Sequence, residues 1–319
     1  MNKARLVEFG VPIVLTVAIF AGLYWYLDRR LDGLPGKPEH AWLVEGVAEG
    51  PVVVLEDLQE ADETYQTRLV AVDLTTGKQL ARRTRDGQGP RACLSAGPLL
   101  LCQFDRDLEF IAARTLRTEA DAADAVRRLA PGARLLPWRF DLDAATGDAL
   151  GLLDDGRVVR MQRNGLVRLD ATVFDVASSP GSTRDGCVYV GDVSLAGRAW
   201  RVRSHGARSI LSWSEGVAEG TPLPTFLHPR MLADLRTGAS VGGADGVAVY
   251  HAAKLDNSSG SRLSMVGPDG ALRWTADLGG ECAAAWRFGD RIVVATKNPA
   301  RRLVAIEIAS GGVAWKVGF

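Results

Sequence analysis

The chain has 319 residues, and its 38 Lys and Arg are matched by 38 Asp and Glu, so its formal net charge is zero. A protein that binds nucleic acid without regard to sequence needs an uncompensated basic surface, so we expect no nucleic-acid partner. With 47% hydrophobic residues the chain can bury a core, and only four Cys in this length argue against a small disulfide-stapled scaffold.

The first element in chain order is an uncharged apolar run, residues 9–27, with Tyr24, Trp25 and Tyr26 near its end. A helix of about 19 residues crosses roughly 30 Å of hydrocarbon, and aromatic residues gather where a membrane meets water. A cleaved signal peptide would have a shorter apolar run and a small-residue cleavage site. The run therefore predicts an uncleaved single-pass helix in contact with the lipid bilayer.

The flanking charges do not decide the orientation of this helix in the membrane, because Lys3 and Arg5 before the helix are balanced by Arg29 and Arg30 after it. A short amino-terminal tail before such a helix most often stays in the cytosol. We therefore expect a cytoplasmic tail (residues 1–8), the anchor (9–27), a Gly/Pro linker (28–40) and a domain (41–319) on the periplasmic or extracytoplasmic side of a bacterial inner membrane.

From residue 41 onward the chain consists of short β-branched or apolar runs closed by turn residues, which is typical of an all-β domain. The exception is residues 119–130, where acidic residues come first and Arg127 and Arg128 come last. With Thr118 as N-cap, this segment is predicted to be a helical insertion.

A turn of the form acid-x-x-Thr/Ser-Gly recurs in this domain. The acid and the hydroxyl accept hydrogen bonds from the turn backbone, and Gly supplies a positive φ. The four clean copies begin and end at Asp73 and Gly77, Asp143 and Gly147, Asp234 and Gly238, and Glu307 and Gly311. Large apolar residues follow such turns closely, and we expect Trp200, Trp274 and Trp315 to pack between neighbouring sheets.

The clean copies lie about 70 to 90 residues apart, roughly twice the length of a four-stranded propeller blade. Residues 41–319 then predict a β-propeller of about seven four-stranded blades, with six or eight also compatible.

Two stretches carry a family resemblance, residues 68–77 (RLVAVDLTTG) and residues 302–315 (RLVAIEIASGGVAW). This pattern resembles the repeat of the pyrroloquinoline-quinone-like β-propellers. The resemblance implies one of two roles, since that family contains quinone-dependent dehydrogenases and non-catalytic scaffolds of the cell envelope. The chain is much shorter than the large dehydrogenases and lacks their vicinal Cys pair, and it has a helix where the envelope lipoprotein has a lipidated Cys.

The sequence gives little support for a catalytic or metal-binding site. Residues 238–242 match G-x-S-x-G, with His228 and His251 as available bases, but that motif needs a strand-to-helix turn, whereas here it overlaps the repeated turn. His40, His205 and the other two His have no metal-ligand spacing. Two acidic pairs of the kind found in calcium loops, Asp141 with Asp143 and Asp154 with Asp155, lack the full ligand spacing of such a loop. We predict no catalytic, cofactor or metal residues.

The cysteines are more informative. If residues 92–96 and 99–104 form a hairpin around Gly97 and Pro98, Cys93 faces Cys102 in a non-hydrogen-bonded pair, close enough for a disulfide. Two buried free thiols are the alternative. Cys187 and Cys282 open separate strand-like runs and are expected to be small core residues.

We therefore expect a non-enzymatic, membrane-anchored scaffold that binds other envelope proteins or serves as an accessory subunit of a membrane complex. The alternatives are a quinone- or metal-dependent propeller enzyme, which needs converging ionisable groups, and a sensor of a small ligand or glycan.

Overall fold

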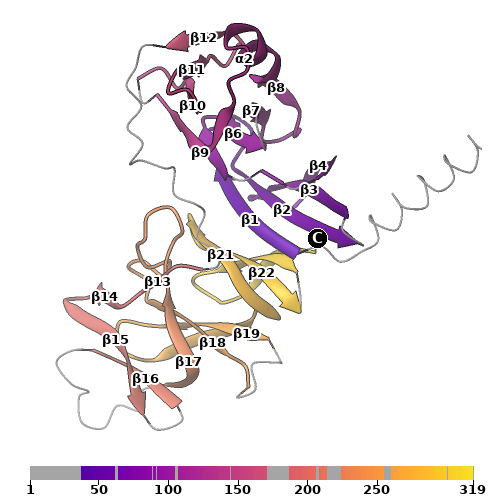
Figure 1. Cartoon of the computed structure of the whole chain (residues 1–319). Coiled ribbons are helices and arrows are strands. Elements are labelled where there is room, and N and C mark those ends of the chain that lie inside the picture. The colour runs from indigo at the N-terminus through magenta and orange to yellow at the C-terminus, as the bar shows by residue number, and fades with distance from the viewer. Residues whose placement is uncertain are drawn as a thin grey trace, which may run out of the picture.

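A computed structural model provides the structure of the chain, and the all-β prediction is confirmed (Figure 1). The residues it describes are 37–61, 64–87, 89–90, 92–104, 107–143, 145–170, 187–205, 208–213, 224–254, 260–299 and 301–318. The predicted tail, the anchor and most of the linker lie outside this set. Among the described residues, none of the helices has the length and apolarity to span a membrane.

Four sheets each consist of four consecutive antiparallel strands. Their strands are β1 (Lys37–Val44), β2 (Val52–Ala61), β3 (Thr64–Asp73) and β4 (Gln79–Asp86); β5 (Ala92–Ala96), β6 (Leu99–Phe104), β7 (Asp107–Ala112) and β8 (Thr118–Asp121); β9 (Leu135–Leu142), β10 (Ala149–Leu153), β11 (Val158–Met161) and β12 (Val167–Asp170); and β21 (Gly280–Phe288), β22 (Arg291–Pro299), β23 (Arg302–Glu307) and β24 (Val313–Gly318). Each sheet has the size and topology of one propeller blade.

A fifth sheet holds eight strands. These are β13 (Tyr189–Val190), β14 (Asp192–Leu195), β15 (Arg198–His205), β16 (Arg208–Trp213), β17 (Thr225–Leu232), β18 (Val247–Ala252), β19 (Ser261–Val266) and β20 (Leu272–Asp277). The start of β17 pairs with β16 and the rest of it pairs with β18, so β17 joins two blade-sized units. The described residues thus form six blade-sized units, and the number of blades in the whole domain stays a prediction.

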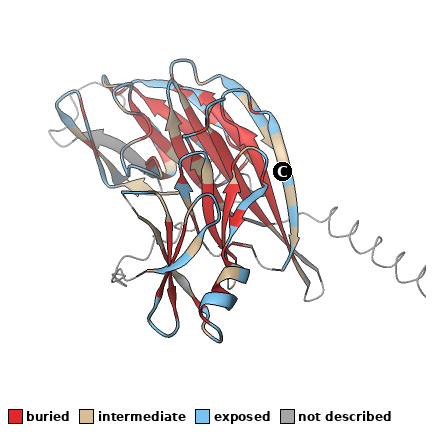
Figure 2. Cartoon of the chain, turned by 90° about the horizontal axis from the view of Figure 1, so that it is seen from above, coloured by how far each residue is buried: buried red, intermediate tan, exposed pale blue. Residues whose placement is uncertain are grey.

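The sheets pack face to face through buried apolar side chains, seen as red along the inner strands in Figure 2. Phe110 and Phe140 share one cluster between the β5–β8 and β9–β12 sheets, and Leu55 and Trp286 share another between the β1–β4 and β21–β24 sheets. Further clusters join β1–β4 to β5–β8 and β18–β20 to β21–β24. The last sheet of the chain therefore packs against the first, as closure of a propeller requires.

Three of the four repeated turns share one full hydrogen-bond pattern, whereas in the fourth the Glu307 carboxylate accepts from the Ser310 hydroxyl at 2.9 Å. At Asp73 the carboxylate accepts from the backbone N–H groups of Thr75 (2.9 Å) and Thr76 (3.0 Å), and the N–H of Gly77 donates to the Asp73 carbonyl (2.8 Å). The turns at Asp143 and Asp234 repeat these bonds. The four turn glycines, Gly77, Gly147, Gly238 and Gly311, have φ between 69° and 72°.

A fifth turn of this kind escaped the sequence pattern. The N–H of Leu116 donates to the Ala112 carbonyl (2.8 Å), and Thr115 stands where the other turns carry Thr or Ser. Ala112 replaces the acid and Leu116 replaces the glycine, although its φ is 56°. Leu116 is 1% exposed, so its burial in the core offsets the strain of a positive φ.

Two tryptophans from fourth strands pack on turn glycines of the next sheet. Trp315 of β24 lies against Gly77, where an added Cβ would come within 2.6 Å of the indole, and Trp274 of β20 lies against Gly311. The Trp274 Nε1–H donates to the Ile308 carbonyl at 2.7 Å. Trp200 is fully buried, in the cluster of β14 to β19.

The helical insertion is shorter than predicted. Helix α2 spans Ala123–Leu129, while Thr118 begins strand β8 instead of capping a helix. The expected N-cap was wrong because β7 pairs with residues 118–121 and uses their backbone groups. Asp124 in the first turn and Arg127 and Arg128 in the last turn agree with the helix dipole.

All four cysteines are in disulfides. Cys93 and Cys102 lie opposite each other on β5 and β6 and are bonded, with Cα atoms 4.1 Å apart. Cys187 and Cys282, expected to be separate core residues, are also bonded. Their pairing could not be read locally, because 95 residues separate them and only packing of β21 beside β13 brings them together.

The two disulfides are expected to differ in their effect on stability. Under the chain-entropy model, closing a 95-residue loop stabilises by about 4.7 kcal/mol and closing a 9-residue loop by about 2.6 kcal/mol. The Cys187→Ser/Cys282→Ser variant should therefore unfold at lower urea concentration than the Cys93→Ser/Cys102→Ser variant. Equal losses, or a larger loss for the second variant, would contradict this.

The glycine turns allow a matched comparison. Gly311→Ala places a Cβ against Trp274 and also strains φ, whereas Gly238→Ala strains φ alone, because nothing lies within 4 Å of its Cβ position. We expect Gly238→Ala to lower the free energy of unfolding by about 1 kcal/mol and Gly311→Ala by about 1–3 kcal/mol more. Urea unfolding followed by Trp fluorescence measures both. Indistinguishable midpoints would contradict the expected difference and show that Trp274 moves aside with no loss in the free energy of unfolding.

Candidate functional site

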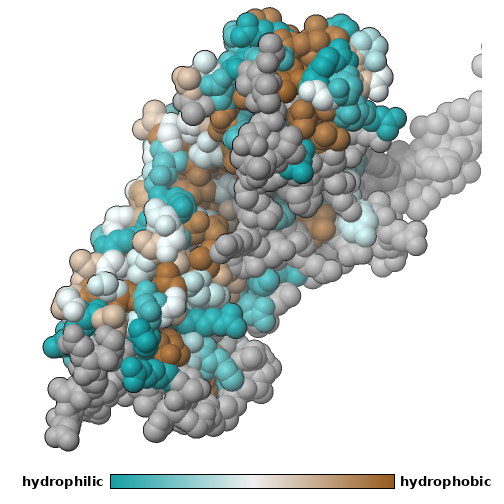
Figure 3. All heavy atoms as spheres, turned by 60° about the vertical axis from the view of Figure 1, so that its left-hand side comes forward, coloured by the Kyte–Doolittle hydropathy of each residue, from teal (hydrophilic) through white to brown (hydrophobic). Residues whose placement is uncertain are grey.

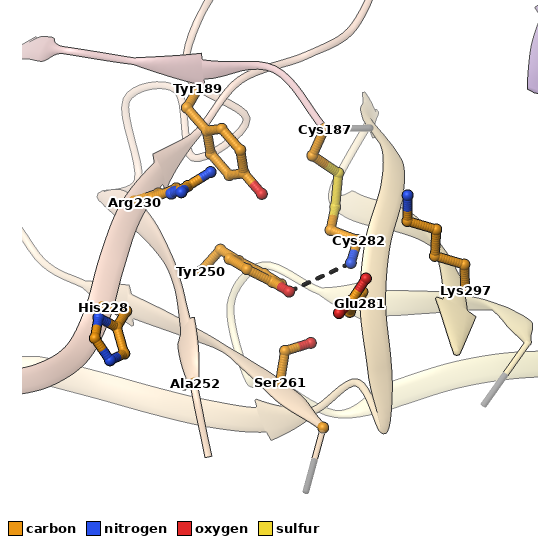
Figure 4. A pocket seen from close by; sticks show the side chains of 11 residues that line it. Cys187, Tyr189, His228, Arg230, Tyr250, Ala252, Ser261, Glu281, Cys282 and Lys297 are labelled. Atoms are coloured by element: carbon orange, nitrogen blue, oxygen red, sulfur yellow. Dashed lines mark hydrogen bonds between the residues drawn. A yellow bond between two sulfur atoms is a disulfide. The ribbon is translucent and has the colours of Figure 1, made fainter. Parts of the chain in front are cut away.

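A polar cavity of about 450 Å³ lies between strands β17 to β19 and strands β21 and β22 (Figure 4). Ala252 at the end of β18, Ser261 at the start of β19 and Lys297 near the end of β22 border it. The Asp234 turn and the Glu307 turn lie toward the other ends of these two sheets. The cavity and these two turns therefore lie at opposite ends of the two sheets.

A bulge in β17 sets one wall of the cavity. The register with β18 shifts between Leu227 and Arg230, and within that shift His228 has φ of 48°. Pro229 has no N–H to contribute to the ladder, so the sequence His-Pro favours the irregularity at this position. After the bulge, Arg230 stands directly opposite Tyr250, and both side chains line the cavity.

Tyr189, Arg230 and Tyr250 form that wall. The Arg230 guanidinium carbon lies 5.0 Å from the ring centre of Tyr189, which is a cation–π contact, and the two tyrosine rings lie 6.0 Å apart. Burial, together with the neighbouring Tyr250, raises the pKa of Tyr189 to about 12. Its phenol is therefore neutral and keeps its proton at physiological pH.

The facing wall carries the Cys187–Cys282 disulfide, Glu281 and Lys297 (Figure 4). The backbone N–H of Cys282 donates to the Tyr250 hydroxyl at 3.3 Å and links the two walls. Glu281 and Lys297 are cross-strand partners on β21 and β22. The cavity thus combines two phenols, two cationic side chains and one carboxylate, a set that can hold a polar, charged group by hydrogen bonds.

A second cavity of about 520 Å³ lies where α2 meets the ends of β4, β6 and β7. Arg85 stacks over the Phe104 ring at 4.3 Å, and Asp107 is partly buried beside them. Burial, with added repulsion from Glu109 and Asp121, raises the pKa of Asp107 to about 6. This carboxyl group changes charge within the physiological pH range.

Of the two histidines considered as bases, His228 lines the first cavity, whereas the turn residues and the three tryptophans do not. The residues of the repeated turns close their own turns, and Trp274 and Trp315 pack between sheets. Within the G-x-S-x-G match, Ser240 forms a bridge with Ala233 after the Asp234 turn. The Nε2 atom of His251 contacts Ser264 at 2.9 Å, and His251 and Ser264 are 7% and 0% exposed.

The acidic pairs have ordinary structural roles. Asp143 caps its own turn and pairs with Arg160 at 2.7 Å, Asp154 accepts from the Arg134 N–H at 3.0 Å, and Asp155 pairs with Arg157. In the part of the chain that the structure describes, no three His, Cys, Asp or Glu side chains gather as a metal site would require.

Sequence reasoning missed the cavity because its residues come from six strands and the segments beside them, between positions 187 and 297. One local signal was available: the His228-Pro229 pair inside a strand-like run indicates a bulge, and bulges are common beside binding sites.

Comparisons with protein-family models and with curated proteins find no match. Solved structures similar to the chain include BamB from Moraxella catarrhalis (12% identity, 85% of this chain and 80% of that chain, TM-score 0.26), apo AztD from Citrobacter koseri (9%, 89% and 86%, 0.31) and the WD40 domain of SCAP from fission yeast (7%, 86% and 67%, 0.26).

The raised pKa of Asp107 predicts a pH-dependent contribution to stability. In the unfolded chain this carboxyl has a pKa near 4, so its contribution is most favourable below about pH 4 and is lost as pH rises through 6. Asp107→Asn should therefore raise the melting temperature at pH 7.5, by an amount corresponding to less than about 3 kcal/mol, since the group is only partly buried. At pH 4.5 the gain should shrink or disappear.

Asp290→Asn is the matched control, because the Asp290 side chain is 88% exposed. Its difference from the parent protein should be small and the same at both pH values. A gain for Asp107→Asn that does not change with pH would contradict the raised pKa.

Proposed function

We propose that the protein is a membrane-anchored extracytoplasmic scaffold that binds another protein of the cell envelope at the cavity between β17 and β21. Residues 9–27 act as the anchor, and residues 41–319 present the cavity outside the cytoplasm. The observation that carries this proposal is the wall formed by Tyr189, Arg230 and Tyr250.

The two disulfides support the proposed location outside the cytoplasm. Disulfides persist in the periplasm and outside cells and are rare in a reducing cytosol. All four cysteines of the chain are paired, one pair within a hairpin and the other between β21 and the segment before β13. An oxidising location on the far side of the membrane agrees with both bonds.

The composition of the cavity favours protein recognition. Tyr and Arg are enriched among the residues that contribute most to the binding energy of protein interfaces. The two tyrosine rings and Arg230 are held in place by each other and by the hydrogen bond from Cys282, so little side-chain entropy would be lost on binding.

Exposed apolar residues form a surface separate from the cavity. Figure 3 shows apolar patches in the upper part of the molecule, where Figure 1 places β5 to β12 and α2. Leu129, Leu166 and Leu169 are exposed large apolar residues of this part, at 40%, 57% and 38%. These residues are distant from the cavity in sequence and in strand order. They could therefore form a second contact surface, but they do not extend the surface at the cavity.

Recognition of a small ligand or glycan is the second candidate. The cavity volume of about 450 Å³ falls within the range of small-molecule sites, and the tyrosine rings could stack on a sugar. A bound small molecule in protein purified from its native membrane would favour this candidate over a scaffold.

Photo-crosslinking in intact cells tests the scaffold proposal. A photoreactive amino acid at position 189 should capture a membrane or envelope protein, whereas the same amino acid at position 313, which is 50% exposed on β24, should not. Adducts are identified by mass spectrometry after extraction in mild detergent. A phosphatase reporter fused after position 319 should be active outside the cytoplasm. Absence of protein adducts at position 189, or reporter activity only in the cytoplasm, would contradict the proposal.

A further inference from the structure

The two tyrosine hydroxyls in the cavity can donate hydrogen bonds to a bound group. Because the Tyr250 oxygen accepts the Cys282 N–H at 3.3 Å, its own hydrogen must point in another direction. Tyr189 also keeps its proton, since burial raises its pKa to about 12, and its hydroxyl extends toward the opposite wall in Figure 4. Phenols that present O–H groups to a cavity favour an acceptor as the bound group.

The charges beside these hydroxyls favour an anionic acceptor. Strand β17, which carries Arg230, lies between β13 and β18, which carry the two tyrosines. Arg230 is exposed, so its guanidinium can donate to a bound ligand while it stacks on Tyr189. Lys297 adds a second positive charge, and Glu281 is the one carboxylate among the lining residues. The cavity therefore carries a net positive charge, with one carboxylate in the opposite wall.

Glu281 argues against a phosphate or sulfate. A doubly charged anion held by Arg230 would be repelled by a carboxylate on the other side of a cavity of this size. A singly charged carboxylate attached to an N–H donor fits both walls, because the carboxylate meets the phenols and the guanidinium while the N–H faces Glu281. Peptides place these two groups within a few bonds of each other.

We propose that the cavity binds a carboxylate carried by a peptide segment of the partner protein, either an Asp or Glu side chain or a C-terminal carboxylate. Tyr189, Arg230 and Tyr250 donate to the carboxylate, and Glu281 accepts an N–H of the same segment. This inference rests on the proposed scaffold function and specifies what the scaffold recognises.

Titration calorimetry of the full-length protein in a nonionic detergent tests the proposal with two pairs of probes. The first pair is acetyl-Gly-Ser-Asp-Gly-Ser-amide and its Asn counterpart. The second is acetyl-Gly-Ser-Gly-Ser with a free C-terminal carboxylate and the same peptide as an amide. At least one carboxylate probe should bind saturably, about tenfold or more tightly than its uncharged counterpart. The pair that shows this difference identifies the source of the carboxylate.

Three variants connect binding to the cavity. Arg230→Gln should weaken binding of the carboxylate probe about tenfold or more, Arg230→Lys should restore part of it, and Tyr250→Phe should weaken it about threefold to tenfold. The matched control is Arg273→Gln, which removes an arginine that is about half exposed and pairs with Asp269 at 2.7 Å on another hairpin. It should leave binding within about twofold.

The inference is overturned if neither carboxylate probe binds, if the uncharged probes bind equally well, or if Arg273→Gln weakens binding as much as Arg230→Gln. Its failure can be told from failure of the scaffold proposal. A partner that still crosslinks at position 189 without any carboxylate preference leaves the scaffold standing, and carboxylate binding without any crosslinked protein leaves only the cavity inference standing.

Discussion

The contact between the β1–β4 sheet and the β21–β24 sheet is the one on which the rest of the structure depends. It joins residues that are far apart in the chain, with Leu55 and Trp286 in one apolar cluster and Trp315 against Gly77. Arg291 adds a hydrogen bond to the Thr75 carbonyl at 3.0 Å. Such contacts between the two ends of a chain are costly in loop-closure entropy, so they need the large apolar area that these sheets bury.

That contact also determines where the candidate site can form. The β21–β24 sheet is held on one side by the β1–β4 sheet and on the other by β18 to β20, through the cluster that includes Met265 and Ile292. The cavity opens between the same pair of sheets, β17 to β19 and β21 with β22. The Cys187–Cys282 bond and the hydrogen bond from Cys282 to Tyr250 then set the separation of its walls.

The balanced charge of the chain has a structural explanation in this arrangement. Many acids lie in turns or face arginines from neighbouring strands, and Arg160, 7% exposed, pairs with Asp143, Asp148 and Asp170 within one sheet. Such pairs satisfy buried charge more than they add stability. The cavity between β17 and β21 differs, because Arg230 stacks on a tyrosine ring at an exposed position, where its donors can serve a ligand.

The sequence alone determined the features that depend on neighbours within a few positions. The turns at Asp73, Asp143 and Asp234 could be predicted because their hydrogen bonds span two to four residues, and the Cys93 and Cys102 register followed from a two-residue turn. The Leu116 turn could not be predicted, because burial of a leucine side chain in the core compensates there for the missing glycine. Thr118 was misassigned because it pairs with β7 in a strand ladder. Only the tertiary structure decided the Cys187–Cys282 bond and the meeting of Tyr189, Arg230 and Tyr250. These contacts form between strands that no local pattern relates, and packing of whole sheets, a sum of many small apolar contacts, brings them together.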